Sequence, residues 1–144
     1  MADEHFLRLE VVDPDGPVFQ GDVAMVILPA AYGELGILPQ HAPLVCQLSI
    51  GEIRVKTLEG AWLSLSVAEG FGKVQFDRVI VLADAAELAS EIDVARAEQA
   101  LARAEERLTL AREGRALDGE EIDPYREGLA AARAKNRLKV VKES

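Results

Sequence analysis

The chain has 144 residues, of which 49% are hydrophobic, and its formal net charge is −9 at pH 7. This length suits one compact domain or two small ones, and the excess of acidic residues argues against a nucleic-acid binder, which needs basic residues to replace phosphate counterions. No apolar run is long enough for a membrane span, the acidic N-terminus is unlike a signal peptide, and the single cysteine, Cys46, excludes an internal disulfide and a cysteine-rich zinc site. We therefore expect a cytoplasmic protein with a hydrophobic core.

The first part of the chain, residues 1–86, is predicted to be a β-sandwich or barrel. Most of the aromatic residues, prolines and glycines occur here, and these residue types favour short strands and tight turns. The expected strands cover residues 6–12, 23–28, 53–58, 62–67, 74–76 and 79–82, and the segment 13–16 is a strong turn. The continuous apolar run 23–28 predicts a strand buried on both faces.

The second part, residues 87–144, is predicted to form two antiparallel helices. One apolar seam repeats with spacings of four and three residues, through Ala97, Leu101, Ala104, Leu108 and Ala111. Ser90 is the expected N-cap of the first helix, Gly114 its expected terminator, and Pro124 marks the first turn of the second helix. The fold class is therefore α+β, with an antiparallel sandwich followed by a helical hairpin. Because alanines bury little area, we expect the hairpin to be weakly held and mobile.

The charge is uneven along the chain. The last 21 residues are basic, with a net charge of +4 on an otherwise acidic protein. Basic side chains four residues apart repel one another on a helix, and an anionic partner would relieve that repulsion. The basic residues of this helix include Arg126, Arg133, Lys135, Arg137 and Lys139. The alternative is an ordinary solvated helix face.

Catalytic and metal-binding constellations are missing from the sequence. The two histidines, His5 and His41, are far apart and lack the spacing of a metal site. A small enzyme that uses Cys46 with His41 is a conceivable alternative, although no third group would orient the pair, and Cys46 is more often a small core residue in such a strand. We therefore favour a binding or coupling subunit without catalytic or metal-ligating residues.

Two segments resemble the ε subunit of the bacterial rotary ATP synthase. They are residues 9–21 and the sequence GELGILPQHAPL at 33–44, and residues 68–71 and 79–84 occupy matching places. The resemblance covers nearly the whole chain and implies a ten-stranded sandwich with a helical hairpin. It also implies a rotor subunit of the central stalk that is bound to the γ subunit and the c ring. Glu34 and His41 would lie at the end that meets these partners, although Glu34 could be an ordinary turn acid and His41 a loop-fixing hydrogen-bond donor.

Part of the resemblance concerns ATP as a regulatory ligand. Residues 92–97 match the I-D-x-x-R-A motif with which some bacterial ε subunits resemble an ATP sensor. The residues that the resemblance assigns to ATP are Glu87, Ile92, Asp93, Arg96, Ala97, Arg103, Arg133 and Arg137. A guanidinium group can donate two parallel hydrogen bonds to phosphate oxygens, so the arginines would hold the triphosphate. The simpler interpretation is that Asp93 and Arg96 form a favourable pair at a helix N-terminus.

The resemblance also implies a regulatory role for the hairpin. Folded down, the helices leave catalysis free; extended, the basic second helix reaches the catalytic α and β subunits and blocks ATP hydrolysis. The resemblance further implies that the subunit helps to couple proton flow to ATP synthesis. It places the subunit peripherally on the cytoplasmic face of the membrane and implies no required cofactor. A static structural adaptor that does not sense ATP is the main alternative.

Overall fold

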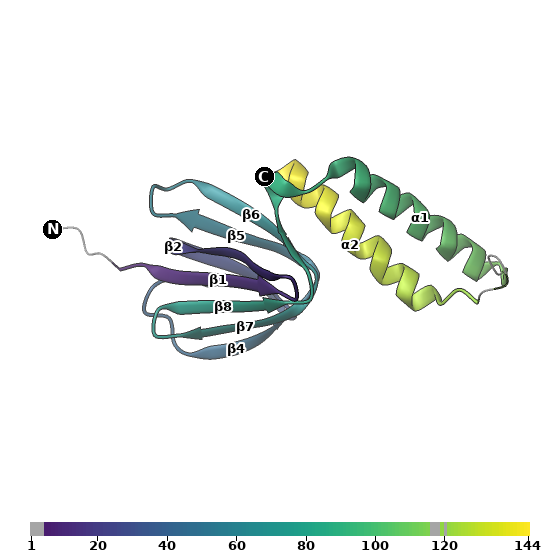
Figure 1. Ribbon diagram of the computed structural model, residues 1–144. Helices are drawn as coiled ribbons and strands as arrows, with labels where there is room; N and C mark the ends of the chain where they lie inside the picture. The colour runs from purple at the N-terminus through teal and green to yellow at the C-terminus, as the bar shows by residue number, and fades with distance from the viewer. Residues whose placement is uncertain (1–4, 116–118, 120) are drawn as a thin grey trace. The chain divides into compact units, whose positions relative to one another are not determined.

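The structure, a computed structural model, describes residues 5–115, 119 and 121–144. The chain divides into two compact units, with a β-rich unit that ends at Glu91 and a helical unit from Ile92 to Glu143 (Figure 1). The expected connection between the helices, residues 114–121, lies partly outside the described residues. The fold class expected from the sequence is confirmed.

Nine strands form the β-rich unit within the residues that the structure describes. They are β1 Leu7–Asp13, β2 Gly16–Ala30, β3 Gly33–Ile37, β4 Leu44–Leu48, β5 Gly51–Thr57, β6 Trp62–Val67, β7 Gly70–Gln75, β8 Arg78–Ala83 and β9 Ala86–Leu88. The resemblance implied ten strands, and the described residues hold one fewer. β9 pairs with β6, so the sheet continues beyond residue 86, where the sequence pattern had placed the end of the sandwich.

The long strand β2 closes the sandwich. Its first half pairs with β1, and its second half pairs with β3, β5 and the end of β4. The remaining strands follow in the order β1, β8, β7, β4 on one side and β5, β6, β9 on the other. Among the described strands, all pairings are antiparallel except β1 with β8, which run parallel. Because β2 pairs with strands of both layers, it joins the two layers of the sandwich into one unit.

Alternation of side chains along the strands builds the core. In β1, residues Leu7, Leu9 and Val11 are fully buried, while the residues between them face outward. The run 23–28 differs from the expected strand buried on both faces, since Val23, Val26 and Leu28 are buried but Ala24, Met25 and Ile27 are only half-buried. The core is closely packed because it consists almost entirely of leucine, isoleucine and valine.

The first helix, α1, spans Val94–Arg112. Asp93 is its N-cap, because the Arg96 backbone N–H donates to Asp93 Oδ1 at 3.1 Å. The prediction that Ser90 caps this helix is wrong: Ser90 lies in a short 3₁₀ turn, η1 (Ala89–Glu91), that precedes the cap. Gly114 ends the helix as expected. Its φ is +69°, and the Arg115 N–H returns to the Leu110 carbonyl at 2.9 Å.

The second helix, α2, spans Pro124–Glu143 and packs along α1. Asp123 supports its start, since Asp123 Oδ1 accepts a hydrogen bond from the Tyr125 N–H at 3.0 Å. The buried residues of the two helices are mostly alanines: Ala97 and Ala104 on α1, and Ala131, Ala134 and Val140 on α2. The helices therefore approach closely through small side chains, as the alanine seam predicted.

Candidate functional surfaces

The motif assigned to ATP surrounds the start of α1. Ile92 and Ala97 are buried in the helical unit, and Arg96 is exposed. The Asp93 carboxylate is already used as the helix cap. Glu87 belongs to the other unit, where it lies half-buried on β9 opposite Ser66 of β6. The motif therefore has a structural role at the helix start, and its role in ATP binding stays a prediction.

The other basic residues lie on the two helices. Arg103 is exposed on α1, and Arg133 is exposed on α2, whereas Arg137 is half-buried. Arg126, Lys135 and Lys139 are also exposed on α2. α2 therefore presents a series of positive charges to its surroundings, which is the property expected of an anion-seeking helix.

A partly buried ion pair joins the two helices, and the sequence reasoning did not anticipate it. Arg107 Nε of α1 donates to Glu127 Oε1 of α2 at 2.8 Å, with side-chain exposures of 30% and 13%. Charged hydrogen bonds of this length are stronger than neutral ones. The spacing of residues within each helix gives no signal for such a pair, because it depends on how one helix lies along the other.

Glu34 and His41 lie at opposite ends of β3 in the sandwich. Glu34 follows the turn between β2 and β3, and its Oε2 accepts a hydrogen bond from Arg54 Nη2 at 2.6 Å. His41 lies in the loop between β3 and β4, with Nδ1 2.8 Å from the Ala42 carbonyl oxygen. Each of the two residues thus has a local partner within the sandwich. Their role in contacts with γ and the c ring stays a prediction.

Cys46 lies on β4 with its side chain packed against the core. Burial raises the pKa of its thiol, and a hydrogen bond with the Gly72 backbone opposes this effect only in part. A raised pKa favours the unreactive thiol over the thiolate that a nucleophile needs. The Cys46 and His41 alternative therefore lacks the activation that its chemistry requires.

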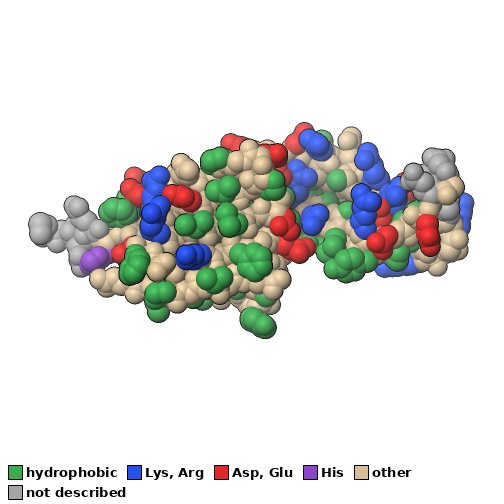
Figure 2. Space-filling view, turned by 60° about the horizontal axis from the view of Figure 1, so that its bottom comes forward, with side chains coloured by type: hydrophobic (Ala, Val, Ile, Leu, Met, Phe, Trp, Pro, Cys, Tyr) green, Lys and Arg blue, Asp and Glu red, His purple; other side chains and the backbone are tan. Residues whose placement is uncertain are grey.

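The outer surface of β4, β7 and β8 carries exposed hydrophobic side chains that the sequence analysis did not single out. Val45 is 69% exposed, and Phe71 and Leu82 are each 57% exposed. Phe71 pairs with both Gln47 and Leu82 across adjacent strands, so these side chains share one face. We call Val45, Phe71 and Leu82 the outer apolar face. Figure 2 shows hydrophobic side chains exposed at several places on the sandwich. Exposed groups of this kind mark interaction sites.

Two classes of site are missing from the part of the chain that the structure describes. Among residues 5–115, 119 and 121–144, no cluster of three or more His, Cys, Asp or Glu side chains could hold a metal ion. Within the same residues, neither helix combines the length and the hydropathy that a membrane crossing requires.

Both units match known protein families. Residues 6–89 match the family model of the ATP synthase delta/epsilon chain β-sandwich domain, and residues 90–142 match that of its long α-helix domain. The ATP synthase epsilon chain of Halalkalibacterium halodurans is 48% identical over 93% of this chain and 96% of its own length. The epsilon chain of Desulforamulus reducens is 45% identical over 92% and 94%.

A solved structure supports the fold. A chain in the cryo-EM structure of the Euglena gracilis mitochondrial ATP synthase matches with a TM-score of 0.73 and 21% identity, over 94% of this chain and 81% of that one. The chain described here belongs to the ATP synthase delta/epsilon chain family. Its function is that of an epsilon chain of ATP synthase.

Proposed function

We propose that this chain turns with the rotor as a non-catalytic subunit and helps to couple proton flow to ATP synthesis. The sandwich docks on the γ subunit and the c ring at the cytoplasmic face of the membrane, and the hairpin regulates ATP hydrolysis. The outer apolar face carries the proposal for docking, because exposed Val45, Phe71 and Leu82 lie on a well-packed sheet that a partner can cover without rearrangement.

Rebinding to the complex tests the docking. ATP synthase depleted of this chain is mixed with the wild type or with Phe71→Ser/Leu82→Ser, and the bound fraction is measured. Removal of these two apolar side chains should weaken binding at least tenfold. Trp62→Ser is the matched control, since Trp62 is 51% exposed on β6, away from this face. Equal binding by the double variant and the control would contradict docking through the outer apolar face.

The basic helix α2 supports an inhibitory role for the hairpin. Its exposed cations include Arg126, Arg133, Lys135 and Lys139, and they complement acidic segments of the catalytic subunits. Removal of residues 92–144 should relieve inhibition of ATP hydrolysis and leave assembly intact. The cut is placed after Glu91 because β9 and η1 belong to the sandwich unit. Loss of assembly in the truncated protein would contradict this division of labour.

ATP is proposed as the ligand that favours the folded-down hairpin. The exposed guanidinium groups of Arg96, Arg103 and Arg133 fit phosphate oxygens. ATP shifts the equilibrium only by its preference for one state of the hairpin. Calorimetry with the isolated chain should show ATP binding at millimolar concentration or below, and loss of that binding in Arg133→Ala/Arg137→Ala. Lys142→Ala, an exposed cation near the end of α2, is the control.

Asp93 allows the structural role and the ligand role to be separated. Asparagine caps a helix about as well as aspartate, so Asp93→Asn keeps α1 intact but removes the carboxylate charge. If the carboxylate helps to order the arginines around ATP, Asp93→Asn should bind ATP more weakly at unchanged helix content. Unchanged ATP binding would show that Asp93 acts only as the N-cap of α1.

A static adaptor is the second candidate, and the Arg107–Glu127 ion pair favours it because it stabilises the closed hairpin. Amide hydrogen exchange distinguishes the two proposals. A mobile hairpin should exchange faster than the sandwich, whereas strong and uniform protection across residues 92–143 would favour the adaptor.

A further inference from the structure

The turn between β7 and β8 has an unusual backbone. Phe76 and Asp77, its two central residues, have φ values of +52° and +59°. Two-residue turns with this geometry favour Asn-Gly, and a bulky aromatic residue at positive φ is a steric outlier. An Asn-Gly turn would join the same two strands with less strain, so the choice of phenylalanine is not explained by the hairpin itself.

Neighbouring segments hold the strained turn in place. Asp77 Oδ1 accepts a hydrogen bond from the Gln40 N–H at 2.6 Å, and the Asp77 carbonyl accepts one from the Arg8 N–H at 2.8 Å. The Phe76 side chain, in contrast, is 82% exposed. Two hydrogen bonds thus hold a strained turn in a conformation that exposes an aromatic side chain. Such an arrangement points to a contact site.

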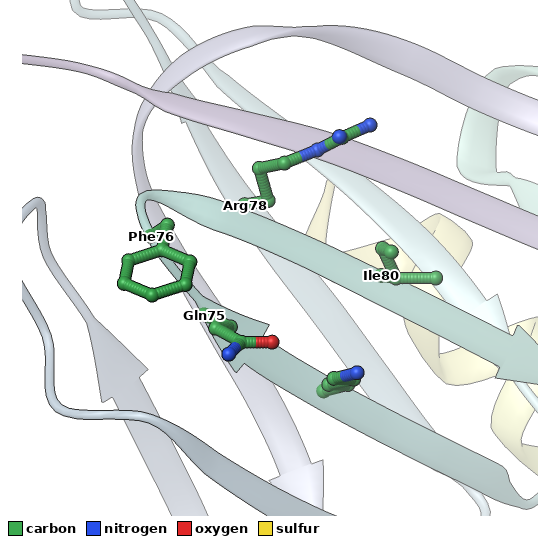
Figure 3. Close-up of a pocket in the computed structure, with 5 residues that line it drawn as sticks. Gln75, Phe76, Arg78 and Ile80 are labelled. Carbon is green, nitrogen blue, oxygen red and sulfur yellow. The ribbon is translucent and has the colours of Figure 1, made fainter.

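A shallow hollow of about 300 Å³ adjoins this aromatic ring, lined by Lys73, Gln75, Phe76, Arg78 and Ile80 (Figure 3). Lys73 lies opposite Ile80, and Gln75 opposite Arg78, in the β7–β8 pairing. Lys73 also lies opposite Val45 of β4, so the hollow is continuous with the outer apolar face. We call it the hairpin-tip hollow.

The hairpin-tip hollow is positively charged, whereas the net charge of the protein is negative. Residues 1–86 contain five basic side chains, and two of them, Lys73 and Arg78, line this hollow. Among the described residues, Lys73 has no ion pair. The ion pair of Arg78 with Glu10 is long, at 3.4 Å, and the Arg78 side chain is 60% exposed. Both cations are therefore available to a carboxylate, and Phe76 and Ile80 offer apolar contact beside them.

We propose that the hairpin-tip hollow binds an acidic segment with an apolar side chain on a neighbouring subunit of the ATP synthase. This inference rests on the proposed docking of the adjacent outer apolar face. The partner's carboxylate meets Lys73 and Arg78, and its apolar side chain packs on Phe76. Such an ionic contact at the rim of an apolar interface speeds association and fixes the register of docking.

Photo-cross-linking identifies the occupant. The chain with p-benzoylphenylalanine in place of Phe76 is assembled into the purified ATP synthase, irradiated, and analysed by mass spectrometry. The expected product joins residue 76 to another subunit within about one turn of an Asp or Glu. No cross-link, a cross-link to lipid, or a cross-link to a segment without acidic residues would overturn the proposal.

A charge reversal tests the role of Lys73. Because this side chain has no ion pair within the described residues, Lys73→Glu breaks no such pair inside the sandwich. We expect the association rate with depleted ATP synthase to fall about fivefold at low salt, with the difference shrinking as salt screens the charges. Lys56→Glu is the matched control, since Lys56 lies on β5 opposite Met25 and Trp62.

The outcomes separate this inference from the proposed function. If Lys73→Glu and Lys56→Glu associate equally well while Phe71→Ser/Leu82→Ser fails to bind, the hollow has no role and docking through the outer apolar face stands. If neither variant of that surface changes binding, both proposals are wrong. Circular dichroism confirms that each variant is folded, and Lys73→Gln, which removes the charge without reversing it, should give a smaller reduction in rate.

Discussion

The two units of the molecule are stabilised by different kinds of side chain. The sandwich buries large aliphatic residues, with Leu9, Ile53 and Leu65 fully excluded from water. The hairpin buries mainly methyl groups, from alanines such as Ala97 and Ala134. Because hydrophobic stabilisation grows with the apolar area buried, at about 25 cal/mol per Å², the sandwich is stabilised far more per residue. The difference in side-chain size therefore predicts a rigid sandwich and a hairpin that opens readily.

Polar interactions take a larger share in the hairpin. The Asp93 cap and the ion pair between Arg107 and Glu127 each contribute an amount comparable to the burial of an alanine. The ion pair breaks when the helices separate, whereas the Asp93 cap lies within α1 and is lost only when that helix unfolds. The hairpin should therefore open at a lower free energy than the sandwich needs to unfold.

Truncation of a leucine in each unit should show the largest contrast. Leu9→Ala leaves a cavity in the sandwich and should lower its free energy of unfolding by about 3 kcal/mol. Leu101 on α1 is only half-buried, so Leu101→Ala should cost about 1 kcal/mol. Urea unfolding followed by circular dichroism measures both changes. Equal losses would show that the hairpin is as well packed as the sandwich.

Glycines with positive φ give a second contrast. Gly70 has φ +138°, and a Cβ there would overlap the Leu82 carbonyl oxygen of the adjacent strand, so Gly70→Ala should cost about 2 kcal/mol. Gly114 has φ +69° and open space around it, so Gly114→Ala should cost about 1 kcal/mol, from backbone strain alone. Thermal unfolding of the two variants checks the order. A larger loss for Gly114→Ala would mean that the end of α1 is more constrained than its surroundings indicate.

Removal of the ion pair between the helices should act on the hairpin alone. Glu127→Ala leaves Arg107 partly buried without its partner and should destabilise the closed hairpin by about 1 kcal/mol. Amide hydrogen exchange should then quicken across α1 and α2 and stay unchanged in the sandwich. Glu98→Ala is the control, because Glu98 is exposed on α1. A change in sandwich protection with Glu127→Ala would argue against independent units.

The sequence predicted the elements that carry strong local signals. Alternating residues in β5 and the alanine seam of α1 appear where expected, and so do the ends marked by Gly114 and Pro124. β9 and η1 were missed because three-residue elements are too short to show a period. As a result, Ser90 was assigned the cap that belongs to Asp93. The sandwich was likewise predicted to end at residue 86, which is the first residue of β9.

The outer apolar face was harder to predict from the sequence. Val45, Phe71 and Leu82 come from three strands, and only their pairing brings them to one surface. The run 79–82 is apolar at every position, which is typical of a strand buried on both faces, yet Leu82 is 57% exposed. A surface that a partner covers has the same apolar pattern as a core. Local sequence therefore cannot distinguish the two without the pairing of the strands.

The reactivity of Cys46 gives the mildest test of the contrast between the units. Burial raises its pKa, so at pH 8 iodoacetamide should modify the folded chain several-fold more slowly than the urea-unfolded chain. The folded state holds the thiol proton more tightly, so rising pH should speed modification and lower sandwich stability slightly. A cysteine placed on the hairpin, Glu98→Cys in a Cys46→Ala background, should react at nearly the unfolded rate, because position 98 is exposed. Equal protection of both cysteines would mean that the hairpin shields its surface as the sandwich does, and the distinction between platform and mobile hairpin would fail.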